Sequence, residues 1–408
     1  MKIENIYPSS MIEQEKARYA DIKAEFSARF SGESEFFSAS GRSEIIGNHT
    51  DHNRGAVMAA GIDLDAIAAA HATSDSVVRI WDKGYGKEIV VDLSSLEVKK
   101  NEIGTTPALV RGTAARMAER GYKIGGLEAV ITSNVFKGSG LSSSAAIEIL
   151  FFTLFNHLYN DGKLSLVEGA QIAKEAENIY FGKPCGLMDQ VACALGRLAA
   201  IDFCCKDEPK IESVELDLAG AGYSIVITDV HADHADLTDE YAAITREMRA
   251  VANFFGKDVL REVDEAIFYA SIKGLRSVVS DRAVLRAIHF FDENRRAIRA
   301  AELAKTGNID EFLELINASG RSSELCLQNA YPAGSTAQAM TLALALTRRL
   351  LSGRGACRVH GGGFGGTILA FVPTDMKENY IAEMNAVFGD GSCTELSIRP
   401  IGACKVEL

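Results

Sequence analysis

The chain has 408 residues, of which 47% are hydrophobic and 24% charged, a composition typical of a globular protein long enough for two domains. The net charge of −12 argues against a nucleic-acid groove, so we expect no nucleic-acid partner. No apolar stretch is long enough to span a bilayer without charge, and residues 1–10 do not resemble a signal peptide, so we expect no membrane partner.

The apolar patterns predict the elements of the first half of the chain. Strands are expected at residues 66–71, 77–81, 89–93, 127–133 and 198–205, and helices at 108–120, 143–158 and 166–180. The strand at 198–205 leads into a polar stretch, residues 206–212, where we place a domain boundary between residues 1–205 and 206–408.

The second half continues in the same manner. Strands are expected at residues 223–230, 356–360, 367–372 and 393–399, and helices at 237–255, 283–305, 309–318, 336–351 and 376–387. Runs of strands interleaved with runs of helices predict an α+β protein rather than a regular βαβ repeat.

The eight cysteines lack the spacing of a zinc site. Cys204 and Cys205 are adjacent in a strand-like run, and we interpret them as small core residues of a protein in a reducing compartment. The simplest expectation is a cytoplasmic protein, and we expect a monomer.

Residues 137–146, Lys-Gly-Ser-Gly-Leu-Ser-Ser-Ser-Ala-Ala, combine a glycine loop with the start of a helix. Glycines let the backbone approach an anion, and a helix that begins in the serines would direct its unpaired N–H groups toward a phosphate. Ile147, Leu150, Phe151 and Leu154 share one helix face, which anchors the element in a core. The same pattern also fits an ordinary buried helix capped by serine.

Other phosphate-binding signatures are missing from the sequence. There is no Gly-x4-Gly-Lys-Ser/Thr, and the His-Arg-Asp and Asp-Phe-Gly motifs of protein kinases are absent. Gly361, Gly363 and Gly366 form a Gly-x-Gly-x-x-Gly, but the β-rich residues 367–372 follow it. This context predicts a glycine-rich turn between two strands rather than a dinucleotide fingerprint.

Three further features carry polar groups. Asp189 follows a Gly/Pro turn and opens an apolar run, where an acid is also a common helix cap. Glu177 lies in a helical run, where a lone acid is usually solvated. The His-x-Asp-His at residues 49–52 recurs at 231–234 and leaves open a zinc hydrolase, although Gly47 stands where the dinuclear pattern requires another His. A serine hydrolase based on residues 142–144 lacks the Gly-x-Ser-x-Gly elbow.

Together these segments resemble the GHMP small-molecule kinases, and within them the galactokinase branch. Residues 41–51 resemble the N-terminal galactokinase signature, and residues 138–146 match the GHMP phosphate loop. Residues 176–190 resemble the catalytic segment, and residues 358–366 the C-terminal glycine motif. The four motifs occur in the family's order and span most of the chain.

The resemblance implies a two-domain GHMP kinase fold, with an N-terminal domain like ribosomal protein S5 domain 2 and a smaller α+β C-terminal domain. The active site would lie in the cleft between them. The implied reaction transfers the γ-phosphoryl group of ATP to the C1 hydroxyl of galactose, with Mg²⁺ as the cofactor.

Roles for individual residues also follow from the resemblance. Asp189 would accept the proton of the hydroxyl, and Arg42 would keep Asp189 ionised. Ser144 and Glu177 would hold Mg²⁺, because it prefers hard oxygen ligands. The nucleotide phosphates would bind at Gly138, Ser139, Gly140, Leu141, Ser142, Ser143 and Ser144, beside the glycines at 361–366. The sugar would bind at Asn48, His49, Thr50, Asp51, Gly186 and Tyr241.

The sugar signature departs from the family pattern at several positions. Asn48 replaces a Glu that binds sugar hydroxyls, Glu44 replaces an Asn and His52 replaces a Tyr, while Lys183 adds a charge near the catalytic turn. A neutral residue 48 removes repulsion of a carboxylate there, so galacturonate or another hexose derivative remains an alternative to galactose. A sugar-binding regulator with the kinase fold is a further alternative, against which the retained Arg42, Glu177 and Asp189 argue.

Overall fold

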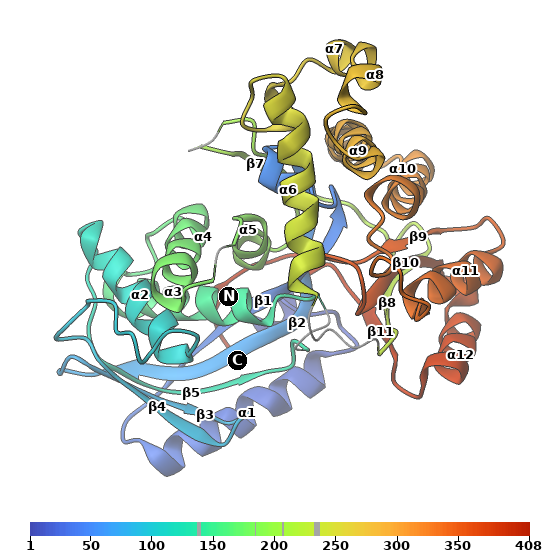
Figure 1. Cartoon of the computed structure of the whole chain (residues 1–408). Helices are drawn as coiled ribbons and strands as arrows, with labels where there is room; N and C mark the ends of the chain where they lie inside the picture. Colours follow the sequence, from blue (N-terminus) through green and yellow to red (C-terminus); the bar gives the residue numbers. More distant parts are fainter. Residues whose placement is uncertain (137–139, 184, 206–207, 232–236) are drawn as a thin grey trace.

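The computed structural model describes residues 1–136, 140–183, 185–205, 208–231 and 237–408. Two sheets dominate the described part of the chain (Figure 1). The larger has eight strands in the order β12-β1-β2-β5-β3-β4, with β6 paired to β2 and β7 to β6. These strands are β1 Glu35–Ile46, β2 Ala56–Ala72, β3 Val77–Asp82, β4 Lys87–Asp92, β5 Leu127–Ser133, β6 Leu198–Asp202, β7 Lys210–Val214 and β12 Cys404–Val406.

Helices cover both faces of the larger sheet. On one face α1, Ile12–Arg29, packs Tyr19, Ile22 and Phe26 into a cluster with residues of β2 and β5. On the other face lie α2 Thr106–Glu119, α3 Ser143–Asn160, α4 Leu166–Glu175 and α5 Met188–Leu195 (Figure 1). Because both faces are covered, β2 is an almost continuous run of small apolar residues, without the alternation of a half-exposed strand.

The smaller sheet has the order β11-β8-β10-β9. Its strands are β8 Tyr223–Asp229, β9 Ala356–Val359, β10 Thr367–Pro373 and β11 Cys393–Leu396, and it packs against α11 Ala339–Leu351 and α12 Lys377–Phe388. The other helices are α6 Thr238–Phe254, α7 Glu265–Ala270, α8 Ile272–Leu275, α9 Asp281–Thr306 and α10 Ile309–Ser322. Single turns of helix are η1 Ile3–Asn5, η2 Asp51–Asn53, η3 Ala176–Phe181, η4 Leu260–Glu262, η5 Ser323–Leu327 and η6 Thr374–Met376.

The α+β class is confirmed, and the glycine motif forms the turn between β9 and β10 as expected. Helix α1 and strand β1 were not predicted from the apolar patterns. Strand β1 was missed because its buried face carries small polar residues such as Ser38, Ser40 and Ser43 instead of an apolar alternation. The expectation for Cys204 and Cys205 was wrong, since β6 ends at Asp202 and Cys205 is exposed.

The chain beyond residue 205 contributes to both sheets. Strand β7 pairs with β6, and β12 pairs with β1, so two late strands belong to the larger sheet. The domain boundary at residue 205 therefore stays a prediction, and the strands of the larger sheet come from both sides of it. In the described part of the chain, no helix is long and apolar enough to cross a membrane.

Candidate active site

The centre of the site is an ion pair between Arg42 and Asp189. Arg42 lies on β1 beside a register shift, and Asp189 lies in the first turn of α5. Arg42 Nε donates to Asp189 Oδ1 and Nη2 donates to Oδ2, each over 2.8 Å. Such a two-point contact fixes the plane of the carboxylate. The Ser142 hydroxyl also donates to Oδ2, so three of the sequence motifs meet at this carboxylate.

The surroundings of Asp189 keep it ionised. Burial raises its pKa, but the charge of Arg42 and the hydrogen bonds from Arg42 and Ser142 outweigh that effect, and the pKa lies below its ordinary value. A carboxylate held ionised in this way can accept a hydrogen bond, or a proton, from a hydroxyl placed next to it.

The phosphate loop reaches this ion pair from the N-terminal end of α3. Ser142 has a φ of 57° and makes no side-chain cap bond to the helix, because its hydroxyl is directed to Asp189. The serine cap considered from sequence is therefore not formed by Ser142. Arg42 donates a backbone hydrogen bond to the carbonyl of Leu141 over 3.0 Å, and its guanidinium also bonds the carbonyl of Gly140.

The glycine turn lies against the phosphate loop. Gly140 has a φ of 72°, and a Cβ at this position would lie 3.1 Å from the ring of His360. A Cβ on Gly361 would lie 3.8 Å from the Cα of Gly140. Only glycine combines this backbone conformation with this close approach. Gly138 and Ser139, expected to bind phosphate, lie outside the described residues.

A buried acidic group is joined to α5 through Gln190. Glu177, in the turn η3, accepts from Lys183 Nζ over 3.2 Å and from Gln190 Nε2 over 3.0 Å. Gln190 Nε2 also donates to Glu148 Oε2 over 3.0 Å. Glu148 and Gln190 were not predicted from the sequence, although a glutamate inside the apolar run of α3 was a usable signal.

The oxygens of this group suit a hard cation. Glu148 Oε1 and Gln190 Oε1 are buried without a hydrogen-bond partner among the described residues. Carboxylate and amide oxygens are the ligand types that Mg²⁺ accepts, so the residues present fit that ion. The described residues contain no group of three or more His, Cys, Asp or Glu that could hold a metal, and much of the second His-x-Asp-His run lies outside them.

The Asn48 side chain is enclosed by protein groups, with 1% of its surface exposed. Its Nδ2 donates to Glu44 Oε1 over 3.0 Å and to the Gly361 carbonyl over 2.6 Å. Its Oδ1 accepts from Asn329 Nδ2 over 2.8 Å and from the Ser323 hydroxyl over 3.4 Å. Two donors and two acceptor positions complete the capacity of an amide, so no position is left for a ligand in this arrangement.

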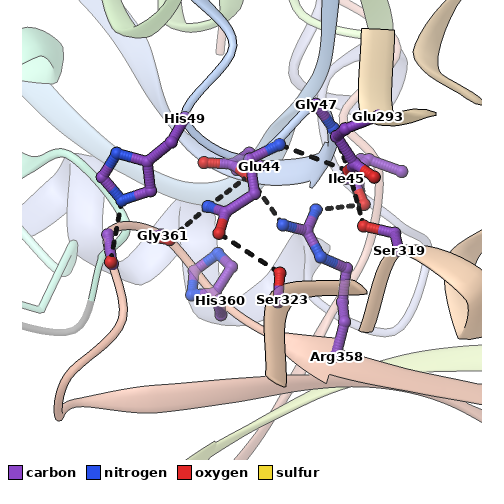
Figure 2. A network of polar contacts seen from close by, with 12 residues as sticks. Glu44, Ile45, Gly47, His49, Glu293, Ser319, Ser323, Arg358, His360 and Gly361 are labelled. Atoms are coloured by element: carbon purple, nitrogen blue, oxygen red, sulfur yellow. Dashed lines mark hydrogen bonds and ion pairs between the residues drawn. The ribbon is translucent and has the colours of Figure 1, made fainter. Parts of the chain in front are cut away.

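The neighbours of Asn48 are held in turn by buried ion pairs. Figure 2 shows Arg358 reaching Glu44 and the carbonyl of Ile45, over 2.8 and 2.7 Å. Glu293 accepts from the backbone N–H of Gly47 and from the Ser319 hydroxyl, over 3.0 and 2.6 Å. Glu44, which replaces an Asn of the family signature, is thus the partner of a fully buried arginine. This network joins β1 to the C-terminal part of the chain.

Among the other residues expected to bind the sugar, Thr50 differs from the rest because its hydroxyl is used within the turn. His49 Nε2 donates to the Gly362 carbonyl over 2.9 Å, and its ring stacks on Tyr241 with centroids 6.5 Å apart. The Asp51 carboxylate lies against Gly186, where a Cβ would come within 2.8 Å of Oδ2. Burial raises the pKa of Asp51 although His49 opposes the shift. Thr50 is fully buried, and its hydroxyl bonds the carbonyls of Gly47 and Ala56, which makes it part of the turn.

Two cavities are lined by residues expected to bind the sugar or the nucleotide. One, of about 710 Å³, is lined by Asp51, His52, Gly186 and Leu187, together with residues of α4 and α6. The other, of about 530 Å³, is lined by Ser143 and Ser144 and by the apolar side chains of Leu109, Ile131, Val135, Ile147 and Phe181. This apolar lining was not predicted from the sequence, because its members come from four separate segments. Asn48 is not among the described residues that line either cavity.

Comparisons with known proteins agree with this arrangement. A model of the GHMP kinases N terminal domain matches residues 108–197, and a model of the galactokinase galactose-binding signature matches residues 24–72. The first range contains the phosphate loop and Asp189, and the second contains Arg42 and the turn at residues 47–52.

Solved structures include a galactokinase from Lactococcus lactis, complexed with galactose, that is 26% identical, with 95% of this chain and 100% of that chain covered and a TM-score of 0.79. The mevalonate kinase of Methanococcus jannaschii is 14% identical, with 90% and 99% covered and a TM-score of 0.64. The phosphomevalonate kinase of Streptococcus pneumoniae is 11% identical, with 92% and 100% covered and a TM-score of 0.59. The chain thus matches the N-terminal domain of the GHMP kinases and the galactokinase galactose-binding signature and is similar over its length to a galactokinase, which supports a sugar kinase.

Proposed function

We propose that the protein transfers the γ-phosphoryl group of ATP to the C1 hydroxyl of galactose, giving galactose 1-phosphate and ADP. One observation carries this proposal. The Arg42–Asp189 pair bonds the phosphate loop at Gly140 and Ser142, and Leu187, directly before the helix α5 that carries Asp189, lines a cavity together with Asp51 and Gly186. The apolar cavity at Ser143 and Ser144 has the lining expected for a nucleotide base.

In this mechanism Asp189 accepts the hydrogen of the C1 hydroxyl. Arg42 holds the carboxylate ionised and stabilises charge on the transferring phosphoryl group. Phosphoryl-transfer enzymes work mainly by positioning the reactants and stabilising this charge. Asp51 accepts from sugar hydroxyls, and the backbone N–H groups at the start of α3 face the phosphates. Glu177 and Ser144 would hold Mg²⁺, with the oxygens of Glu148 and Gln190, unpartnered among the described residues, next to Glu177, and the ion would neutralise phosphate charge when it is bound.

The test is a coupled assay of ADP release with galactose, ATP and Mg²⁺. We expect turnover by the wild type and a loss of about 10²- to 10⁴-fold in kcat for Asp189→Asn, the range for removal of an acid–base group. Asp161→Asn, an exposed position in the loop after α3, is the matched control and should leave kcat unchanged. Wild-type turnover by Asp189→Asn would overturn the assigned roles. Absent turnover with measurable binding of galactose and ATP would favour a sugar-binding regulator.

A further inference from the structure

The cavity at Asp51 and Gly186 extends well beyond those two residues. Its volume of about 710 Å³ falls in the range of roughly 300–1,000 Å³ that holds drug-sized ligands. A single hexose is smaller than such a ligand. The cavity is also lined by Gln171 and Lys174 of α4 and by Thr245 and Arg249 of α6. The acceptor site therefore has room for a substituent on the sugar.

The cationic side chains that line this cavity are of two kinds. Arg54 is paired with Glu262 over 2.7 Å. Lys174 and Arg249, in contrast, have no ion-pair partner among the described residues, and both line the cavity. The acidic Glu175 does not offset them, because Arg116 and Arg120 both bind its carboxylate, over 2.6 and 2.9 Å. Lys174 and Arg249 thus border this cavity without an ion-pair partner among the described residues, and the other acid of its lining is Asp51, whose pKa is raised by burial.

The neutral side chain of His52 belongs to the lining of the same cavity. Asn53 Nδ2 donates to His52 Nδ1 over 2.8 Å, while Asn53 Oδ1 accepts from the backbone of Leu260, which fixes the orientation of the amide. His52 Nε2 must then carry the ring hydrogen, and it is buried without an acceptor among the described residues. Burial, with nearby cationic groups including Arg249, lowers the pKa of His52 to about 3, so the ring stays neutral.

We propose that the preferred acceptor is a galactose derivative that bears an anionic group, a carboxylate, phosphate or sulfate, held by Lys174 and Arg249. The inference rests on the proposed function and specifies the substrate class of the same site. An anion would give these two cations an ion-pair partner, and charge-assisted hydrogen bonds are stronger than neutral ones. Each contact made in the transition state is expected to add about tenfold to kcat/KM.

The experiment compares kcat/KM for galactose, galacturonate, galactose 6-phosphate and galactose 3-sulfate at saturating ATP and Mg²⁺. We expect at least one acidic sugar to exceed galactose by about tenfold or more. The four sugars distinguish a carboxylate from a phosphate or sulfate, and a substituent at C6 from one at C3. The acidic-to-neutral ratio of kcat/KM should fall about tenfold in Lys174→Gln or Arg249→Gln, and further in the double variant. Arg246→Gln, exposed on the same helix and absent from the cavity lining, should leave the ratio unchanged.

The outcomes separate this proposal from the proposed function. Turnover of galactose with no acidic sugar preferred, or a ratio unaffected by the double variant, overturns the anionic acceptor alone. If no sugar is turned over, calorimetric titration with galactose and the three acidic sugars still decides, since tighter binding of an acidic sugar that the double variant loses supports it and equal binding refutes it.

Discussion

Arg42 and Asp189, 147 residues apart in the chain, face each other through two parallel hydrogen bonds of 2.8 Å. The pair does more than neutralise charge, because the same guanidinium also bonds the Gly140 carbonyl of the phosphate loop. The acceptor side and the donor side of the proposed reaction are therefore positioned by one side chain.

Arg42→Met should change both the rate and its dependence on pH. Without the guanidinium, burial raises the pKa of Asp189 unopposed by its main counter-charge, so the acidic limb of the kcat/KM profile should move to higher pH. We expect kcat to fall about 10²- to 10³-fold. Arg42→Lys keeps the charge but not the two-point contact, so its kcat and its acidic limb should lie between those of the wild type and of Arg42→Met. An unchanged acidic limb in Arg42→Met would show that another group controls it.

Asn48→Glu tests whether residue 48 faces the sugar or the protein. The family pattern alone predicts that this change keeps or improves galactose turnover. The observed contacts predict the opposite, because a carboxylate loses both donors and lies beside Glu44. Like charges this close repel by about 1–4 kcal/mol. We expect a lower Tm and similar losses on all sugars. A normal Tm with improved galactose turnover would place residue 48 against the sugar.

Gly186→Ala should impair sugar binding while leaving the fold intact. The added Cβ would lie 2.8 Å from Asp51 Oδ2, the end of a side chain that can move. We expect KM for galactose to rise about tenfold, the effect of displacing one charged hydrogen-bonding group. KM for ATP and the Tm should change little, since the other cavity does not include this residue. A rise in both KM values would point to a disturbed backbone instead.

Glu15→Gln should stabilise the protein above neutral pH. Glu15 Oε1 is buried without a partner among the described residues, and burial, reinforced by Asp65, raises its pKa to about 7 despite Arg18. The folded state thus holds the proton more tightly than the unfolded chain does. The free energy of unfolding then falls as pH rises from about 4.5 through 7.

A glutamine removes that decline, so the variant should gain up to about 3 kcal/mol at pH 8 and little at pH 4. Denaturant unfolding at the two pH values measures the difference. Glu13→Gln, exposed on the same helix, is the control and should match the wild type at both. Equal stability of Glu15→Gln and wild type at pH 8 would mean that Glu15 is ionised there at no cost.

The sequence was sufficient wherever a local pattern carries the information. The apolar face of α3 follows from 3.6-residue spacing, and the turn between β9 and β10 follows from the glycines at 361–366. The order of four motifs likewise indicated the family. These features depend on neighbours in the chain, so one sequence contains them.

Tertiary structure decided the features that depend on distant contacts. The partner of the Ser142 hydroxyl is Asp189 instead of the helix end, and the Asn48 amide is satisfied by Glu44, Gly361 and Asn329. Lys174 and Arg249 border one cavity because α4 and α6 converge there, although 75 residues separate them along the numbered sequence. Residue types alone cannot state which donors and acceptors meet, because a buried polar group takes whichever partner the packing of remote elements brings to it.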